Sequence, residues 1–180
     1  MLKSPTRQII LILSEWGFTW KGLKDNRSGE WWLIAQISLI AVHLLPPYIS
    51  LNLKIINTSI PSKGLYIIII GFFLAIIAFA SLGDNLSPLP EPKKGANLVI
   101  IRSYKYCRHP IYQAILVCSL GTVIYLDSVI HLILFVLLSL VLRGKALREE
   151  EKLLKIHSEY NRYRKITPAI IPRIPLLDWR

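Results

Sequence analysis

Two polar segments of the chain carry side chains that could do chemistry. The first is the run 104–112 (YKYCRHPIY), in which Arg108 and His109 come directly before Pro110. Proline suits the first position of a helix, where its missing N–H is not needed, and the unpaired N–H groups of that first turn attract negative charge. A cation, an imidazole and the ring of Tyr112 therefore indicate a ligand site at a helix entrance. The same residue types also fit a simpler role, in which they anchor a helix at the lipid headgroups.

The second segment is the helical pattern over 145–163 (KALREEEKLLKIHSEYNRY). Plotted at 100° per residue, its apolar residues share one face, and Glu150 falls in the middle of that face. An unpaired buried carboxylate is costly, so Glu150 must have a partner or line a wet cavity. Glu149 and Glu151 lie to either side, where each can pair with a lysine one turn away, as Glu149 can with Lys145. For these two glutamates, a solvated surface is the simpler interpretation.

The composition indicates that these segments lie beside a membrane. Of the 180 residues, 53% are hydrophobic and 18% are charged, and the mean hydropathy is +0.45. An ordinary globular domain carries about 25% charged residues, and a soluble fold of this size could not bury so much apolar surface. The net charge of +11 lies mostly outside the apolar runs, which is typical of loops facing an anionic cytoplasmic leaflet and not of a nucleic-acid-binding protein. The two cysteines predict neither a disulfide framework nor a zinc site.

Four apolar runs predict the helices that position the polar segments. They are Trp31–Leu45, Leu65–Leu82, Ile111–Leu126 and Val129–Leu142. The second has eighteen uncharged residues and is the clearest membrane span, whereas the last two are short for a hydrocarbon core of about 30 Å. We expect these two to form a helical hairpin around a tight turn at 127–128. Residues 1–29 mix basic and aromatic side chains, which predicts an amphipathic helix at the membrane interface.

The distribution of charge predicts the topology. With four spans and both termini in the cytoplasm, 20 of the 22 lysines and arginines lie on the cytoplasmic side, and the inverted topology would place the same 20 outside. We therefore expect an all-α integral membrane protein with about four transmembrane helices, an N-terminal interfacial helix and a C-terminal cytosolic helix. Residues 1–82 would supply the interfacial helix and the first two spans, and residues 83–180 the polar loop, the hairpin and the C-terminal helix.

The order of the motifs carries a resemblance to a known family. Tyr104 and the sequence Arg108-His109-Pro110-x-Tyr112 are followed by a short hairpin, then by Glu149-Glu150, and then by Glu159-Tyr160-x-x-Tyr163. This arrangement resembles the isoprenylcysteine carboxyl methyltransferase and phospholipid methyltransferase superfamily over roughly residues 83–175. The resemblance implies S-adenosylmethionine-dependent methyl transfer to a carboxylate or an amine of a lipidic or prenylated acceptor at the cytosolic membrane face. Neither a metal ion nor nucleic acid is expected, and the oligomeric state is left open.

The resemblance also implies where the cofactor and the substrate bind. The cofactor would lie between the loop before the hairpin and the helix after it, at positions that match Ala96, Asn97, Leu98, Val99, Tyr104, His109, Pro110, Ile111, Tyr112 and one of Glu149 and Glu150. Family spacing points to Glu149, whereas the helical-face argument points to Glu150, which we favour. The family's substrate-facing arginine lies four residues before this glutamate, where the chain has Lys145 or Ala146. The candidate catalytic residues are therefore Arg108, Lys145 and Arg143.

Two alternatives remain open from the sequence. Membrane sterol reductases have a similar C-terminal architecture and bind a nicotinamide cofactor such as NADPH, but their histidine is typically followed by x-Asn-Tyr, whereas this chain has His109-Pro110-Ile111-Tyr112. A non-catalytic membrane scaffold with a basic cytosolic surface would explain the spans and the charge. It would leave Glu150 and the order of the motifs as coincidence.

Overall fold

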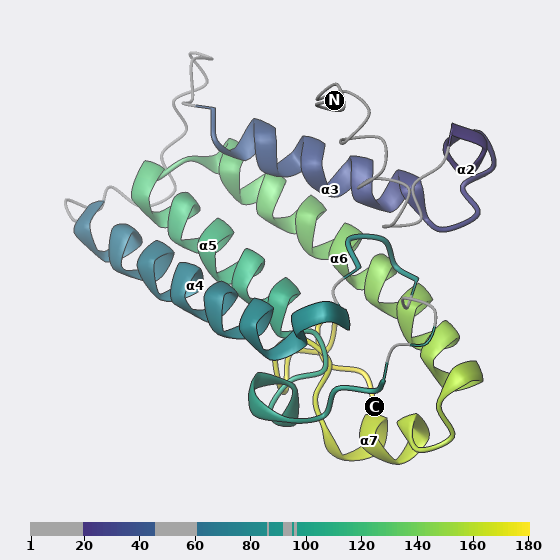
Figure 1. Ribbon diagram of the computed structural model, residues 1–180. Helices are drawn as coiled ribbons and strands as arrows, with labels where there is room; N and C mark the ends of the chain where they lie inside the picture. Colours follow the sequence, from purple (N-terminus) through teal and green to yellow (C-terminus); the bar gives the residue numbers. More distant parts are fainter. Residues whose placement is uncertain (1–19, 46–60, 86, 92–94, 96) are drawn as a thin grey trace, which may run out of the picture.

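The computed structural model describes residues 20–45, 61–85, 87–91, 95 and 97–180, and within them the chain forms helices and no strands (Figure 1). Most of the predicted interfacial helix lies outside the described residues. The helices are α2 (Trp20–Asp25), α3 (Glu30–His43), α4 (Pro61–Leu82), α5 (Pro110–Leu126), α6 (Val129–Ile156) and α7 (Tyr160–Ile166), with the short 3-10 helices η1 (Gly83–Asn85) and η2 (Arg102–Lys105). The all-helical part of the expected fold is confirmed for the described chain.

The four predicted apolar runs are all helical, and two of the helices reach the length of a membrane span. α4 and α6 are long and apolar enough to cross a bilayer. α5 has 17 residues and α3 has 14, so at about 1.5 Å per residue both are shorter than a hydrocarbon core of about 30 Å. α4 leaves large apolar side chains such as Phe72 and Phe73 exposed, as a helix that faces lipid would.

A single helix contains both the last apolar run and the first part of the polar segment 145–163. α6 has 28 residues and runs without interruption from Val129 to Ile156, because the segment between span and tail consists mostly of strong helix formers and contains no proline. The sequence predicted a separate C-terminal helix over 145–163, and this division is wrong, since the first part of that segment continues α6. The backbone leaves the helix at His157, which is extended (φ −121°, ψ 109°), and α7 begins at Tyr160.

α4 and α5 pack closely because glycines line their interface (Figure 1). Gly64 of α4 faces the backbone of α5, and Gly121 of α5 faces the backbone of α4. A Cβ atom at Gly121 would lie 2.7 Å from the backbone nitrogen of Ile68, and one at Gly64 would overlap the backbone of Tyr125. Small residues allow two helix backbones to approach in this way inside a membrane.

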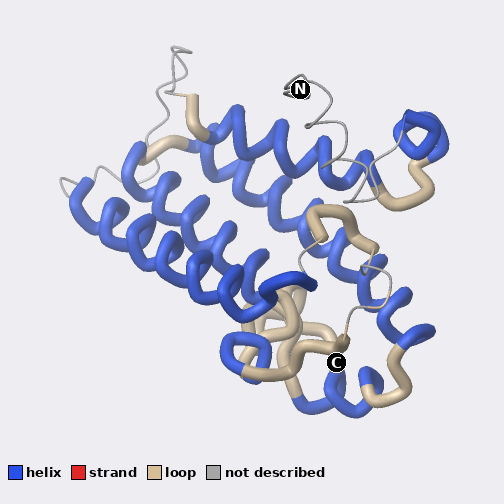
Figure 2. Tube along the Cα trace, viewed as in Figure 1, coloured by secondary structure: helices blue, strands red, loops and turns tan. Residues whose placement is uncertain are grey.

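The C-terminal tail closes the end of the bundle at which α4 ends and α5 begins (Figure 2). The backbone N–H of Arg108 donates to the oxygen of Pro168 at 2.9 Å, and that of His109 donates to the oxygen of Ala169 at 3.0 Å. Ala169 is fully buried against residues of α5 and α6. The polar loop and the polar tail therefore meet, as the sequence predicts.

The position of α3 along α6 is fixed by two contacts. The ring of Trp32 fills the space beside Gly144, where any Cβ atom would overlap it. Arg148 of α6 donates hydrogen bonds to two backbone oxygens in the turn before α3. This arrangement places Gln36 of α3 beside Lys145 of α6, at the end of the bundle that the tail closes.

Replacement of Gly121 by alanine should destabilise the protein, because the new Cβ atom would meet the α4 backbone, which cannot move aside as a side chain can. Overpacking of this kind costs about 1–3 kcal/mol, so the midpoint of thermal unfolding in detergent should fall by about 2–10 °C. Ala80→Leu adds more volume on the exposed side of α4 and should leave the midpoint unchanged. Equal midpoints for Gly121→Ala and the wild type would contradict the close packing.

Candidate active site

A buried ion pair forms the centre of the candidate site. Nε of Arg108 donates to Oε1 of Glu150 at 3.0 Å, and the two side chains are 0% and 2% exposed. Arg108 comes from the loop before α5, and Glu150 comes from the face of α6 that the sequence predicts to point inward. Glu150 is therefore buried, as predicted, and it is paired. A carboxylate at this depth is stable only with such partners.

The other hydrogen-bonding groups of the pair are also occupied. Arg108 donates further hydrogen bonds to backbone oxygens of the tail, which belong to Arg164, Thr167 and Trp179. Glu150 accepts hydrogen bonds from Nε2 of His109 at 2.9 Å and from Nε1 of Trp179 at 3.0 Å. The pair thus joins the loop before α5, helix α6 and the tail, so both residues have a structural role.

Glu149, the preceding residue of α6, points in a different direction. Its carboxylate accepts a hydrogen bond from the Tyr112 hydroxyl at 3.0 Å, and 30% of the side chain is exposed. The Tyr112 ring stacks on that of His109, with ring centroids 5.3 Å apart and an interplanar angle of 1°. The interpretation of Glu149 as a solvated surface residue is wrong, because its side chain lines two cavities.

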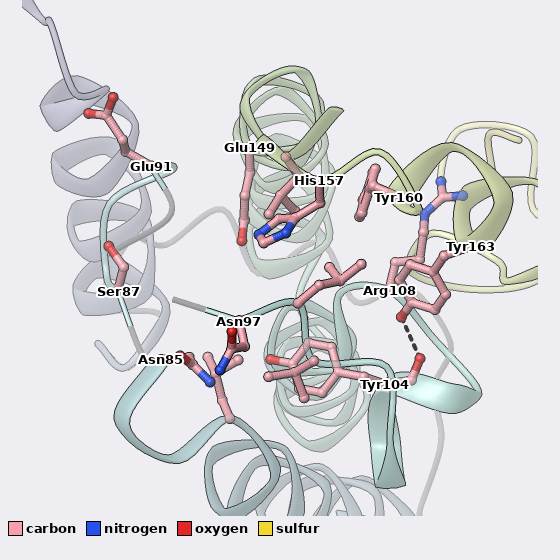
Figure 3. Close-up of a pocket in the computed structure, with 14 residues that line it drawn as sticks. Asn85, Ser87, Glu91, Asn97, Tyr104, Arg108, Glu149, His157, Tyr160 and Tyr163 are labelled. Atoms are coloured by element: carbon pink, nitrogen blue, oxygen red, sulfur yellow. Dashed lines mark hydrogen bonds between the residues drawn. The ribbon is translucent and has the colours of Figure 1, made fainter. Parts of the chain in front are cut away.

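The first cavity, here called the polar cavity, is an open cleft between the polar loop, α6 and α7 (Figure 3). Its polar lining residues are Asn85, Ser87, Glu91, Asn97, Tyr104, Arg108, Glu149, His157, Tyr160 and Tyr163. In Figure 3, Glu149 and His157 of α6 lie across the cavity from Asn85 and Asn97.

The second cavity, here called the apolar cavity, lies between α3, the end of α4 and the start of α5. Most of its lining is apolar and includes Leu33, Phe79, Leu82, Ile111 and Ile115. The two cavities share a wall, which consists of Leu82, Ser87, Tyr104, Arg108 and Glu149. A polar ligand in one cavity and an apolar ligand in the other would therefore meet at this wall.

Lys145 brings a buried ammonium group to the apolar cavity. The residue is 3% exposed, and Nζ donates to Oε1 of Gln36 at 2.6 Å and to the backbone oxygen of Pro88 at 2.7 Å. The ammonium group lies 5.4 Å from the centre of the Tyr112 ring. Among the described residues no carboxylate lies within 4.0 Å of it, so the pairing with Glu149 that the sequence suggested is not formed.

The structure divides the predicted site residues between the two cavities. Asn97, Leu98 and Val99 line the polar cavity, His109, Ile111, Tyr112 and Lys145 line the apolar cavity, and Tyr104, Arg108 and Glu149 line both. Glu150 and Pro110 are buried outside the lining of these cavities. Arg143 lies over the Trp179 ring, 5.7 Å from its centre. Ala96 lies outside the described residues.

The phenols of the polar cavity stay protonated at neutral pH. Burial, followed by the nearby charge of Glu149, raises the pKa of Tyr104, and burial also raises the pKa values of Tyr160 and Tyr163. These groups can donate hydrogen bonds but cannot act as bases. Burial raises the pKa of the Cys107 thiol to about 12, so this cysteine is not a nucleophile. Within the described part of the chain, no cluster of three or more His, Cys, Asp or Glu side chains could hold a metal ion.

Trp179, Glu91 and Gln36 are among the residues of the site that were not foreseen. Trp179 lies beyond the segment of the resemblance, and no sequence pattern points to it. Glu91 lies in a proline-rich segment that the sequence indicates only as a connector. Burial opposes its ionisation, but hydrogen bonds from Ser28 and Lys152 lower its pKa. Glu91 is therefore a carboxylate at the cavity wall. Gln36 could have been identified from the sequence, because a polar amide inside an apolar run is a candidate functional residue.

Replacement of Glu150 by glutamine should destabilise the fold. The change leaves Arg108 buried without its counter-charge, and the loss of one partner from a buried pair costs about 3–5 kcal/mol. The midpoint of thermal unfolding in detergent should fall by about 10 °C. Glu151→Gln makes the same chemical change on the exposed side of the same helix and should shift the midpoint by no more than about 1–2 °C. If the two variants unfold at the same temperature, Glu150 does not hold the fold together.

Comparison with known proteins places the chain in a family. Residues 61–159, more than half of the chain, match the phospholipid methyltransferase family. A protein-S-isoprenylcysteine O-methyltransferase from Schizosaccharomyces pombe is 26% identical over 172 residues, which cover 87% of this chain and 73% of that relative. A protein of the same description from Rattus norvegicus is 29% identical over 123 residues, 65% of this chain and 43% of the relative, so the match spans less than half of the rat protein. No solved structure matches the chain.

The matched region contains α4, α5 and α6, and with them Arg108, Lys145 and both glutamates of the site. The motifs that suggested the superfamily lie largely within the same region. The chain therefore belongs to the phospholipid methyltransferase family and is a membrane methyltransferase of the superfamily that also includes the isoprenylcysteine carboxyl methyltransferases.

Proposed function

We propose that the protein transfers the methyl group of S-adenosylmethionine to the carboxylate of a prenylated or similar lipidic acceptor. The observation that carries this proposal is the wall shared by the polar and apolar cavities. A water-soluble cofactor suits the polar cavity and an apolar acceptor suits the other, so their reacting groups would meet at Tyr104 and Glu149. The similarity to two S-isoprenylcysteine O-methyltransferases supports this class of acceptor.

The polar cavity offers groups that are complementary to S-adenosylmethionine. When bound, this cofactor supplies an electrophilic methyl group on a sulfonium centre. Glu149 and Glu91 can accept charge-assisted hydrogen bonds from its ammonium group and its ribose hydroxyls. The Tyr160 side chain lines the cavity, and its hydroxyl is buried without a hydrogen-bond partner among the described residues.

Of the two adjacent glutamates, we assign the cofactor contact to Glu149. Its carboxylate lines the cavity, and among the described residues the Tyr112 hydroxyl is its hydrogen-bond donor. Both oxygens of Glu150 already accept hydrogen bonds from protein groups. This assignment agrees with the family spacing and replaces the preference for Glu150 that the helical-face argument gave. Glu150 would then support the site by holding Arg108 in place.

The residues around the two ligands would act mainly by positioning them. The attacking oxygen, the methyl carbon and the departing sulfur must lie in line, and correct orientation supplies much of the acceleration in such a displacement. In such a transfer, a lone pair of the acceptor oxygen would form the bond to the methyl carbon, and the electron pair of the broken carbon–sulfur bond would stay on sulfur. No proton moves, so a carboxylate acceptor needs no general base. Apolar side chains such as Ile111 and Ile115 exclude water, which keeps the carboxylate reactive.

The buried ammonium group of Lys145 favours a carboxylate acceptor over an amine. Both of its hydrogen-bond partners, the Gln36 side chain and the Pro88 backbone, are neutral. A carboxylate in the apolar cavity would compensate its charge, whereas a cationic amine would add a second positive charge in surroundings of low polarity. We therefore propose that Lys145 takes the place of the family's substrate-facing arginine. Arg108 and Arg143, the other basic candidates, are engaged by the tail and would support the fold.

We further propose that the protein crosses the membrane several times, with both termini in the cytoplasm. The two long apolar helices, the flanking shorter ones and the 20-to-2 division of basic residues support this topology. The polar cavity then opens to the cytosol, where a soluble cofactor is available. Residues 83–180 would form the methyltransferase core, and residues 1–82 would contribute the first spans and part of the acceptor cavity, through Leu33 and Phe79.

Binding measurements on the detergent-solubilised protein test the cofactor assignment. S-adenosylmethionine should raise the unfolding temperature and NADPH should not, because a ligand that binds only the native state stabilises it. Glu149→Gln removes a charged acceptor from the polar cavity and should weaken S-adenosylmethionine binding at least about tenfold, or about 1.4 kcal/mol. Glu151→Gln, the exposed neighbour, should bind like the wild type. Stabilisation by NADPH alone would overturn the proposed function, and unchanged affinity in Glu149→Gln would overturn the role of Glu149.

Labelling of introduced cysteines tests the topology. Asp127→Cys lies in the turn between α5 and α6, and Lys165→Cys lies at the exposed end of α7. An impermeant thiol reagent added outside intact cells should label the first variant, and should label the second only after the membrane is opened. The wild-type chain, with Cys107 buried, serves as the background control. The reverse pattern would show that the termini are not cytoplasmic.

A further inference from the structure

The apolar cavity receives a polar side chain from outside the family match. Gln36 belongs to α3, whereas the matched region begins at residue 61. It is 9% exposed and lines the apolar cavity together with Lys145. Oε1 of Gln36 accepts a hydrogen bond from Nζ of Lys145 at 2.6 Å, which fixes the position of the ammonium group. An amide at this place in an apolar helix requires an explanation, because burying its polar atoms is unfavourable unless they have partners.

The Gln36–Lys145 pair retains hydrogen-bond donors that the protein does not use. The amide nitrogen of Gln36 carries two N–H groups, and it donates to no group in the described part of the chain. The Gln36 side chain lines the apolar cavity, so a ligand in that cavity would lie beside its amide group. Lys145 has three N–H groups, of which Gln36 and the Pro88 backbone take two. Two adjacent nitrogens can therefore donate to the same ligand.

We propose that Gln36 is a specificity-determining residue, which selects a carboxylate at the head of the acceptor together with Lys145. Nε2 of Gln36 would donate to one carboxylate oxygen, and the remaining N–H and the charge of Lys145 would attract the other. The inference rests on the proposed function and adds to it the residue that reads the acceptor head group. A neutral ester or amide would lose the charge interaction, and an amine would meet donors where it needs acceptors.

The chemistry of an amide explains why glutamine suits this position. A neutral oxygen can hold Lys145 without neutralising its charge, so the charge remains available to the acceptor. A glutamate has nearly the same shape, but it would form an ion pair with Lys145 and would repel an incoming carboxylate. An exchange of glutamine for glutamate at this position should therefore change the acceptor preference with little change in packing.

The pair also lies at a suitable distance from the cofactor side of the site. The ammonium group of Lys145 is 5.4 Å from the centre of the Tyr112 ring, and the Tyr112 hydroxyl donates to Glu149, which lies on the shared wall. A carboxylate held by Gln36 and Lys145 would thus be anchored next to the wall at which the two cavities meet. The apolar part of the acceptor would extend along Leu33 and Ile115.

The test compares two ligands that differ only in the head group, an N-acetyl-S-prenyl-L-cysteine carboxylate and its carboxamide. Their dissociation constants would be measured with the full chain in detergent, together with that of S-adenosylmethionine and the KM for the carboxylate. The wild type should methylate the carboxylate and bind it more tightly than the carboxamide. In Gln36→Glu, the preference for the carboxylate should fall at least about tenfold, its KM should rise correspondingly, and S-adenosylmethionine affinity should stay unchanged. Gln113→Glu, the same change on a residue outside both cavities, should behave like the wild type.

The outcomes separate this inference from the proposed function. A wild type that neither methylates nor prefers the carboxylate would overturn the proposed function, and the role of Gln36 with it. A wild type that does both, with an unchanged preference in Gln36→Glu, would overturn the role of Gln36 alone. If Gln36→Glu fails to bind S-adenosylmethionine because it does not fold, Gln36→Met replaces it. This variant keeps the length and removes both the donor and the acceptor, and it should likewise lower the carboxylate preference; an unchanged preference in it would reject the inference.

Discussion

The candidate active site depends on the buried ion pair between Arg108 and Glu150, which holds together the elements around the two cavities. Two opposite charges taken out of water cost several kcal/mol each, which their attraction offsets only when the remaining hydrogen-bonding groups are also satisfied. Here the tail supplies the remaining hydrogen bonds. Its backbone oxygens accept from Arg108, and the Trp179 indole donates to Glu150. The tail therefore supports the site through Arg108 and Glu150, although no residue after Tyr163 lines either cavity. Loop, helix and tail are held by one cluster of hydrogen bonds, and the two cavities form around it.

The two consecutive glutamates divide structural and ligand-binding roles because successive residues of a helix differ in direction by about 100°. Glu150 points into the protein and is saturated with donors, whereas Glu149 points to the shared wall. Lys145 lies about one turn before Glu149 on the same helix, so the cation proposed to bind the acceptor and the carboxylate proposed to bind the cofactor are held on one rigid element. The continuity of α6 therefore connects a helix that is long and apolar enough to cross a membrane directly to both cavities.

The sequence predicted the features that depend on a single helix, and it missed the contacts that depend on a second element. The apolar runs, the hairpin and the inward direction of Glu150 follow from the periodicity of single helices, and the structure has all of them. Periodicity cannot show which group pairs with a buried charge. Lys145 was expected to meet Glu149 one turn away, but its partner is Gln36, more than a hundred residues earlier. The continuity of α6 was missed for another reason: the hydrophobic pattern changes near residue 143 although the helix propensity does not.

The way the two ligand sites are built suggests how one fold can serve different acceptors. The polar cavity is lined by the loop, α6 and α7, which the Arg108–Glu150 cluster holds firmly. The apolar cavity takes part of its lining from α3, which packs against α6 through Trp32 and Gly144 and lies outside the family match. A substitution on α3 can thus change the head group that the acceptor site prefers without disturbing the buried ion pair or the cofactor side. On the proposed function, selectivity for the acceptor could change without loss of methyl-donor binding, because α3 lines only the apolar cavity, whereas α6 contributes to both.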